Sequence, residues 1–304
     1  MEAAASGRSP SRALLYTMIA AMVLFWSANF IVGKVALRQF PPLLLSGLRI
    51  ALAMVFILPV YAWQSMSRSG RKWDGKDLST LMCLGLFGVA LNQLFFVLGL
   101  HYTSVAHSAI LIATTPLCVL VIAAAIGQER ITMLKAGGMV LAMLGVAALN
   151  VLPSPGSGSS TGPTVLGDFF VFLAGLTFAL FTVFGKGVSG RHSAVTVNTF
   201  GYVSGALGLA PMTLWQARGF EFHRVDAAGW VSLAYMALFP SVVCYLIYYH
   251  ALKFIPASRV SAFSYLQPAI ATLMAAAALG ERITMPLVAG GAVIFAGVYL
   301  TERG

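Results

Sequence analysis

Apolar residues along the chain occur in ten long runs that short polar segments separate. The runs occupy residues 14–36, 41–63, 78–100, 105–127, 131–151, 165–186, 195–216, 228–252, 257–280 and 283–300. Each is close to the length of about 20 residues that an α-helix needs to cross the hydrocarbon of a bilayer. Backbone groups inside hydrocarbon can bond only to one another, which a helix achieves within one segment. The pattern therefore predicts an all-α membrane protein with ten transmembrane helices.

Composition supports this interpretation and excludes other classes. Hydrophobic residues make up 59% of the 304 positions and charged residues 9%, whereas charged residues are roughly 25% of an average soluble domain. The net charge of +10 does not indicate nucleic-acid binding, because Lys and Arg are scattered between the apolar runs. Cys83, Cys118 and Cys244 lie inside apolar runs without metal-ligand spacing, so we expect free thiols, no metal and no cofactor.

Positive charges in the loops predict how the helices are oriented. Thirteen Lys and Arg residues fall on one side of the ten runs, in the termini and alternate loops, and five fall on the other side. Loops rich in Lys and Arg stay in the cytoplasm, so we predict that both termini are cytoplasmic. One cation, Arg49, falls well inside the second run, where a charge costs at least roughly 2.5–3.5 kcal/mol.

The two halves of the chain repeat one another at a shift of 152 residues. Glu129-Arg-Ile-Thr-Met133 recurs as Glu281-Arg-Ile-Thr-Met285, in register with two glycines and a proline. We therefore divide the chain into an N-terminal cytoplasmic tail (1–13), a first repeat (14–151), a flexible connector (152–164), a second repeat (165–300) and a C-terminal tail (301–304). The connector is rich in Ser, Gly and Pro, which is typical of flexible linkers.

The odd number of helices in each repeat has a consequence for function. After five helices the second repeat must enter the membrane from the opposite side, and inverted repeats are typical of secondary transporters. In such proteins the substrate site lies near the midplane between the repeats. The sequence contains no HExxH, GxSxG or Walker motif and no carboxylate pair inside a run. We therefore expect a transporter rather than an enzyme, with an intramembrane enzyme as the weaker alternative.

The order of particular residues resembles a known family. The first run contains Trp26-Ser-Ala-Asn29-Phe30-Ile-Val-Gly33-Lys34, and Pro41-Pro42 and Arg49 follow it. Each half closes with a proline-bearing helix, a Glu-Arg turn and a glycine-rich helix. This set covers residues from about 14 to 300 and resembles the EamA family of the drug/metabolite transporter (DMT) superfamily.

The resemblance implies a central cavity and a role for the chain. The cavity would be lined by the runs at 14–36, 78–100, 105–127, 165–186, 228–252 and 257–280, with 131–151 and 283–300 outside it as scaffold or dimer surface. The protein would be a monomer or a homodimer through those two helices. Members are mostly multi-pass exporters of amino acids and related metabolites in the bacterial inner membrane, and some are importers. We therefore predict an exporter of amino acids or related zwitterionic or aromatic compounds that works by alternating access. A broad-specificity efflux carrier of drugs or toxic compounds is the alternative.

Candidate substrate-binding residues lie on helix faces in both repeats. Trp26, Asn29 and Phe30 share one face of the first helix by their i, i+3, i+4 spacing. The remaining candidates are their partners at the 152-residue shift and polar or aromatic residues of four other runs: Phe178, Phe181, Thr182, Asn92, Gln93, Phe96, Thr114, Thr115, Tyr245, Tyr248, Tyr249, Ser264, Tyr265 and Gln267. For all of them, packing between helices is the alternative role.

Charged residues and prolines form a second set of candidates. Lys34, Arg49 and Lys186 are candidates for a gate or for contact with a substrate carboxylate, with snorkelling or structural hydrogen bonds as the alternative. Pro116 and Pro268 fall inside predicted helices, where a proline produces either a hinge or a static kink. We interpret Glu129-Arg130 and Glu281-Arg282 as anchors at the membrane interface. All nine acidic residues are near run ends or in loops, so we expect transport without proton coupling through a carboxylate.

Overall fold

The computed structural model describes residues 11–66, 75–103, 108, 111–151, 164–279 and 285–304, and these residues form helices and short connections. The α-helices are α1 (Arg12–Leu37), α2 (Pro42–Met66), α3 (Gly75–Gly85), α4 (Asn92–Tyr102), α6 (Thr115–Ala125), α7 (Met133–Val151), α8 (Val165–Ser189), α9 (Ala194–Ala217), α10 (Ala227–Met236), α11 (Cys244–Leu252), α12 (Ala257–Ala262), α13 (Leu266–Leu279) and α14 (Met285–Arg303). Two π-helical turns, η1 (Leu86–Leu91) and η3 (Ala237–Val243), and two 3₁₀ turns, η2 (Phe222–Arg224) and η4 (Phe263–Tyr265), complete the set.

Several of these helices are parts of one longer segment. The turn η1 joins α3 to α4, η3 joins α10 to α11, and η4 joins α12 to α13 without a break in the chain. The described residues thus form ten helical segments and no strand, which confirms the predicted all-α class. Five stretches among them are long and apolar enough to cross a membrane: Arg12–Leu37, Pro42–Met66, Leu78–Tyr102, Val165–Val188 and Ala227–Leu252.

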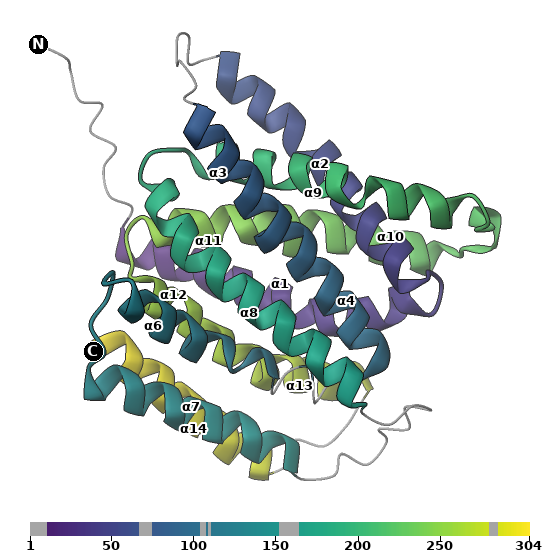
Figure 1. Ribbon diagram of the computed structural model, residues 1–304. Coiled ribbons are helices and arrows are strands. Elements are labelled where there is room, and N and C mark those ends of the chain that lie inside the picture. The colour runs from purple at the N-terminus through teal and green to yellow at the C-terminus, as the bar shows by residue number, and fades with distance from the viewer. Residues whose placement is uncertain (1–10, 67–74, 104–107, 109–110, 152–163, 280–284) are drawn as a thin grey trace, which may run out of the picture.

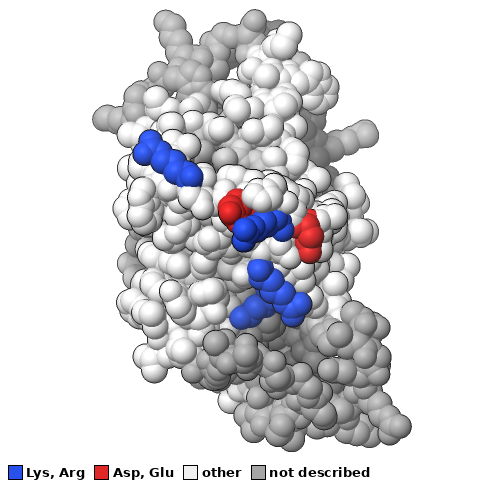
Figure 2. Space-filling view, turned by 90° about the vertical axis from the view of Figure 1, so that its right-hand side faces the viewer, with Lys and Arg blue, Asp and Glu red and all other residues white. Residues whose placement is uncertain are grey.

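The helices lie side by side as a bundle with two distinct ends (Figure 1). The beginning of α1 and the C-terminus of the chain lie at one end, where the hydroxyl of Tyr16 donates to the carboxylate of Glu302. We call this the termini end. Figure 2 shows the opposite end, which holds the α9–α10 connection and where acidic and basic side chains lie together on an otherwise uncharged surface. An ion pair at this end joins Arg224 to Glu221 at 2.5 Å.

Matching contacts in the two halves show that the repeat is inverted. The Lys34 Nζ donates to the carbonyl oxygen of Thr103 at 2.9 Å, and the Lys186 Nζ donates to that of Ile255 at 3.2 Å. Both partners are also related by the 152-residue shift. In both cases a cation satisfies a carbonyl just beyond a helix C-terminus, where the helix dipole favours positive charge. The helix α1 begins at the termini end and reaches Lys34 at the other end, whereas Ile255 lines the same cavity as Arg12 and Glu302 at the termini end. The two contacts therefore lie at opposite ends of the bundle.

Both prolines lie in the first turn of a helix rather than in the middle of one. Pro116 is the second residue of α6, directly after a turn at Ala113–Thr114, and Pro268 is the third residue of α13, directly after the 3₁₀ turn η4. Proline is tolerated in the first helical turn, because the N–H that it lacks has no intrahelical partner there. The two prolines therefore begin the second part of an interrupted helix in each half, rather than kinking a continuous one.

Glycines bring α7 and α14 close together at one edge of the bundle (Figure 1). A Cβ at Gly138 would lie 2.7 Å from the carbonyl oxygen of Gly297, and a Cβ at Gly297 would lie 2.5 Å from the backbone nitrogen of Ala142. Small residues at such positions let membrane helices approach closely enough for dense van der Waals contact. The glycine faces of the last helix in each half are therefore occupied by one another within the chain.

Glu129 is buried at the termini end, which corrects its predicted role as an interfacial anchor. Its side chain is 6% exposed and pairs with the Lys135 Nζ at 3.1 Å. It also accepts hydrogen bonds from the backbone N–H and the hydroxyl of Ser258, in the first turn of α12. Gly127, with φ +73°, turns the chain at the end of α6 so that Glu129 points inward. The carboxylate thus links the first half to the second, whereas Glu281-Arg282 lies outside the described residues.

Candidate substrate-binding site

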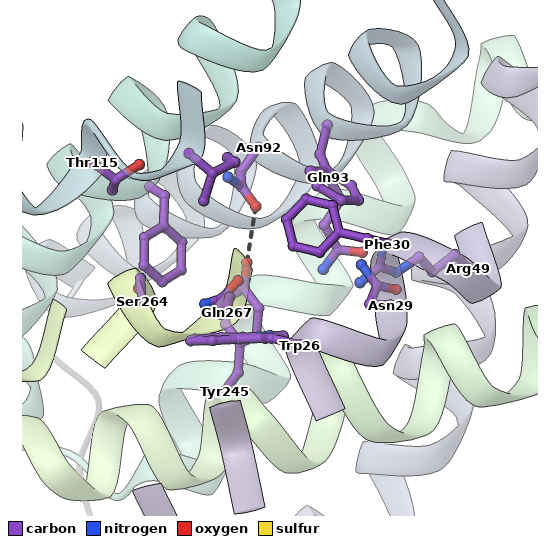
Figure 3. A pocket seen from close by; sticks show the side chains of 13 residues that line it. Trp26, Asn29, Phe30, Arg49, Asn92, Gln93, Thr115, Tyr245, Ser264 and Gln267 are labelled. Atoms are coloured by element: carbon purple, nitrogen blue, oxygen red, sulfur yellow. Dashed lines mark hydrogen bonds between the residues drawn. The ribbon is translucent and has the colours of Figure 1, made fainter. Parts of the chain in front are cut away.

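A cavity of about 80 Å³ lies between the two halves, near the middle of α1 and α8 (Figure 3). That space holds only a few water molecules at roughly 10–15 Å³ each. The first half contributes α1, α2, α4 and α6, and the second contributes α8, α11, η4 and α13. The lining residues are Trp26, Asn29, Phe30, Arg49, Asn92, Gln93, Phe96, Ile112, Thr115, Phe178, Tyr245, Ser264 and Gln267.

Three aromatic rings from three helices pack at right angles along one wall of the cavity. The ring centroids of Trp26 and Phe178 are 5.7 Å apart at an interplanar angle of 85°, and those of Trp26 and Tyr245 are 6.2 Å apart at 88°. Phe178 and Tyr245 complete the triangle at 6.0 Å. Such edge-to-face pairs stabilise one another by about 0.5–1.5 kcal/mol beyond burial of their surface. The three rings therefore support one another, and they present ring faces and edges to the cavity.

Each π-helical turn is followed directly by residues of the cavity. Asn92 and Gln93 come directly after η1, and Tyr245 is the second residue after η3. A π turn inserts one residue into a helix and frees backbone groups, and such turns are frequent at functional sites. In the η3 case the freed carbonyl of Pro240 accepts from the indole Nε1 of Trp26 at 3.0 Å. The Tyr245 hydroxyl donates to the Asn92 Oδ1 at 3.1 Å, which joins the two halves across the cavity (Figure 3).

Arg49 is the charged residue of the cavity and is 3% exposed. Its Nε donates to the hydroxyl of Ser241 at 2.9 Å, in the η3 turn of the other half. No carboxylate among the described residues pairs with it. Gln93 lies in the same network, because the Ser241 hydroxyl donates to its Oε1 at 3.4 Å, and its Nε2 donates to the hydroxyl of Tyr202 at 3.3 Å. A guanidinium has five N–H donors, so Arg49 can hold its structural bond to Ser241 and still donate to a ligand.

Two buried polar atoms of the cavity have no hydrogen-bond partner in the structure. They are the side-chain oxygens of Asn29 and Thr115, both buried. A buried polar atom without a hydrogen bond costs about 1–3 kcal/mol, and in a native protein such atoms call for a ligand, a water or an ion. Together with Arg49 they give the cavity one cation and two unpaired oxygen acceptors.

Most of the residues predicted from the sequence line this cavity. Trp26, Asn29, Phe30, Arg49, Asn92, Gln93, Phe96, Thr115, Phe178, Tyr245, Ser264 and Gln267 do so, and Ile112 is added by the structure. Ile112 had no signal in the sequence, since it is one of many aliphatic residues in its run.

Other predicted residues lie behind the wall and support it. The hydroxyls of Thr182 and Tyr248 bond to each other at 2.9 Å, while at the matching positions of the first half Phe30 and Phe96 pack with centroids 5.4 Å apart. Phe181 packs against Tyr249, which is fully buried. The remaining predicted residues away from the lining are Thr114, whose hydroxyl bonds to the Leu111 carbonyl, Tyr265, which is buried, and the lysines Lys34 and Lys186.

The sequence of this chain matches a known protein family. The sequence model of the EamA-like transporter family matches the chain twice, over residues 13–151 and 165–303. The chain belongs to the EamA-like transporter family. This family is part of the drug/metabolite transporter superfamily, and the double match covers both five-helix halves. The protein is therefore a multi-pass membrane transporter of small molecules built from two inverted repeats.

Relatives and a solved structure are similar along nearly the whole chain. An uncharacterized transporter of Bacillus subtilis, YetK, is 27% identical over 94% of this chain and 86% of its own. An uncharacterized transporter of Archaeoglobus fulgidus is 27% identical over 95% of this chain and 98% of its own. A WAT1-related chloroplastic protein of Arabidopsis thaliana is 23% identical over 95% of this chain and 69% of its own. One crystal structure shares the fold, with a TM-score of 0.75 at 16% identity over 96% of this chain and 98% of that one.

Proposed function

We propose that this EamA-like transporter exports amino acids or closely related zwitterions with an aromatic or apolar side chain, and that the central cavity is their binding site. The observation that supports this most directly is the charge pattern of the cavity. It contains a buried arginine that no described carboxylate neutralises, beside an unpaired amide oxygen and a wall of three aromatic rings.

Each part of such a substrate has a chemical partner in the cavity. Arg49 has N–H donors beyond the one bound to Ser241, and they suit a carboxylate. The Asn29 Oδ1 is an acceptor without a donor and suits the ammonium group. Trp26, Phe178 and Tyr245 suit an apolar or aromatic side chain, and their ring faces also favour a nearby cation. Binding would then pair the buried charge and one of the two unpaired oxygens.

The size of the cavity supports movement of the two halves. Its volume of about 80 Å³ is well below the roughly 300–1,000 Å³ of ligand pockets. A substrate would therefore require the halves to part at one end. Contacts between the halves lie at both ends of the bundle, for example Glu129 with Ser258 at the termini end and the Thr103 hydroxyl with the Asp168 carboxylate at 2.7 Å at the other. Alternating access would release the contacts of one end at a time.

The proposal can be tested by ligand stabilisation of the purified full-length protein. A ligand that binds only the folded state raises its melting temperature by mass action. We expect L-phenylalanine or L-tryptophan to raise it, and phenethylamine, which lacks the carboxylate, to raise it much less. The effect of the amino acid should be lost in Arg49→Gln and kept in Arg38→Gln, a control that removes the same charge at the exposed end of α1.

Two results would contradict the proposal. If phenethylamine and phenylalanine stabilise the wild type equally, carboxylate recognition is wrong and a broad-specificity efflux carrier becomes the better interpretation. If Arg49→Gln melts like the wild type without ligand and still responds fully to the amino acid, Arg49 is not in the binding site.

A further inference from the structure

A second and larger cavity lies at the termini end, away from the substrate site. Its volume is about 570 Å³, within the range of ligand pockets, roughly 300–1,000 Å³. It is lined by the first turns of α1, the connection from α11 to α12, the first turn of α12, and the last two turns of α14: Arg12, Leu15, Tyr16, Phe254, Ile255, Pro256, Arg259, Tyr299, Glu302 and Arg303. None of these residues lines the central cavity.

Three arginines from three different helices meet in this cavity. They are Arg12, Arg259 and Arg303, and no carboxylate among the described residues forms an ion pair with them. The Nε of Arg259 is buried and has no hydrogen-bond partner. The guanidinium of Arg303 is held 4.9 Å from the ring centroid of Tyr299. At the opposite end, by contrast, Arg224 is neutralised by Glu221. An excess of cationic donors, one of them buried and unpaired, favours a phosphate or another anion.

The acidic residue in the cavity, Glu302, indicates that the ligand also carries a hydrogen-bond donor. Glu302 accepts from the Tyr16 hydroxyl with one carboxylate oxygen, while its other oxygen, Oε2, is buried and has no donor. An anion without a hydroxyl, such as sulfate, would leave that oxygen unpaired. A headgroup that carries a hydroxyl beside its phosphate would bond to the arginines and to Glu302 at once. With three cations and one anion in the cavity, a ligand with net negative charge fits better than a zwitterion.

The surface next to the cavity indicates that the ligand is a lipid. Phe295 and Tyr299 are 59% and 56% exposed, and together with Arg303 they follow one another at intervals of four residues along α14. Residues at that spacing lie on one face of a helix. This face would therefore offer apolar rings to an acyl chain directly beneath the arginine that faces the cavity. Basic pockets between membrane helices are known to hold lipid headgroups.

We propose that this cavity binds the headgroup of an anionic glycerophospholipid of the phosphatidylglycerol type. The arginines bind its phosphate, Glu302 accepts a hydrogen bond from its glycerol hydroxyl, and an acyl chain lies along Phe295 and Tyr299. The site is separate from transport chemistry, and it ties α1, α12 and α14 together at the termini end.

Native mass spectrometry of the full-length protein in detergent would test this directly, by titration with phosphatidylglycerol and with phosphatidylcholine. We expect tighter retention of phosphatidylglycerol, and at least about tenfold weaker binding in Arg259→Gln or Arg303→Gln, because each variant removes a charge-assisted hydrogen bond. The matched control is Arg218→Gln, which removes one charge from an exposed site at the other end and should bind as the wild type does. Melting curves without lipid establish that each variant is folded.

Three outcomes would overturn the proposal. Equal binding of the two lipids would show that the cavity does not select for an anionic headgroup. Equal weakening in Arg218→Gln would show that net charge, not this cavity, retains the lipid. Competition by water-soluble glycerol phosphate at concentrations equal to those of the lipid would show that the ligand is a free anion. Failure of glycerol phosphate to compete supports the lipid.

Discussion

Replacing Glu129 with Gln removes the charge of a buried carboxylate that links the two halves at the termini end. The side chains of Glu129 and Lys135 are 6% and 8% exposed, and the carboxylate also accepts two hydrogen bonds from Ser258. Breaking a buried ion pair on one side typically costs about 3–5 kcal/mol, because the remaining charge is left unpaired. The amide still accepts from Ser258, so we expect a loss near the lower bound, about 3 kcal/mol.

The chain provides a matched control for this variant. Glu221 pairs with Arg224, but the side chains are 51% and 73% exposed. Exposed pairs of this kind contribute about 0–1 kcal/mol, so Glu221→Gln should change stability by less than that. The double variant Glu129→Gln with Lys135→Met should recover part of the loss, since no buried charge then remains without a partner.

Unfolding free energies from titration with SDS in mixed micelles, followed by circular dichroism, would measure these differences. Our interpretation requires Glu129→Gln to be several times more destabilising than Glu221→Gln. If both variants lose less than about 1 kcal/mol, then Glu129 is solvated in the membrane-bound protein and does not link the halves. If the double variant is less stable than Glu129→Gln alone, the inference that Glu129→Gln destabilises the protein by leaving Lys135 unpaired is wrong.

Three further results follow from particular contacts. Burial opposes ionisation of Glu129, but its bonds to Ser258 and Lys135 outweigh burial and hold the pKa of the carboxyl below its ordinary value. The ionised carboxylate therefore stabilises the folded state above the unfolded-state pKa, and this stabilisation is lost as pH falls through the folded pKa. The wild type and Glu129→Gln should thus converge in stability in acid. Gly138→Val should destabilise the protein by about 1–3 kcal/mol in the same unfolding assay, because a Cβ there would lie 2.7 Å from the Gly297 carbonyl oxygen. Gly137→Val should not destabilise it, because nothing lies within 4 Å of a Cβ at that position. Equal effects of the two substitutions would refute close packing of α7 and α14. Since none of the residues that line the central cavity is acidic, uptake into proteoliposomes should change little when an imposed pH gradient is collapsed, and strong accumulation of a net-neutral substrate driven by that gradient alone would contradict this.

The sequence repeat predicted much of the fold because it reports on whole helices. The paired Lys34 and Lys186 recur in the structure as the same contact at opposite ends, and the aligned Trp26 and Phe178 meet in one aromatic wall. Helical spacing placed Trp26, Asn29 and Phe30 on one face, and in the structure all three line the cavity. It could not separate the residues that line the cavity from those that pack behind them. Phe178 and Phe181 lie on the same broad face of α8, and only their packing against α11 determines which of the two lines the cavity.

Features that depend on distant contacts could not be predicted. The partner of Arg49 is Ser241, in a π turn 192 positions away, and nothing local marks a π turn in either half. Glu129 looked like an interfacial residue because a Glu-Arg pair at a helix end usually is one. Its burial follows from the approach of α12, which only the tertiary structure shows. The cluster of arginines at the termini end has the same origin, since its members lie near three separate helix ends.

Counterflow in proteoliposomes is the measurement that tests most directly whether the cavity between the halves is a carrier site. Liposomes containing the protein would be loaded with unlabelled tryptophan, and entry of radiolabelled tryptophan would be followed. A carrier that alternates about one cavity must show faster entry when the opposite side is loaded, and Trp26→Ala or Tyr245→Ala should abolish that stimulation in protein that still inserts and melts normally. Entry that is unaffected by the load, or stimulation that survives both substitutions, would contradict transport through this cavity.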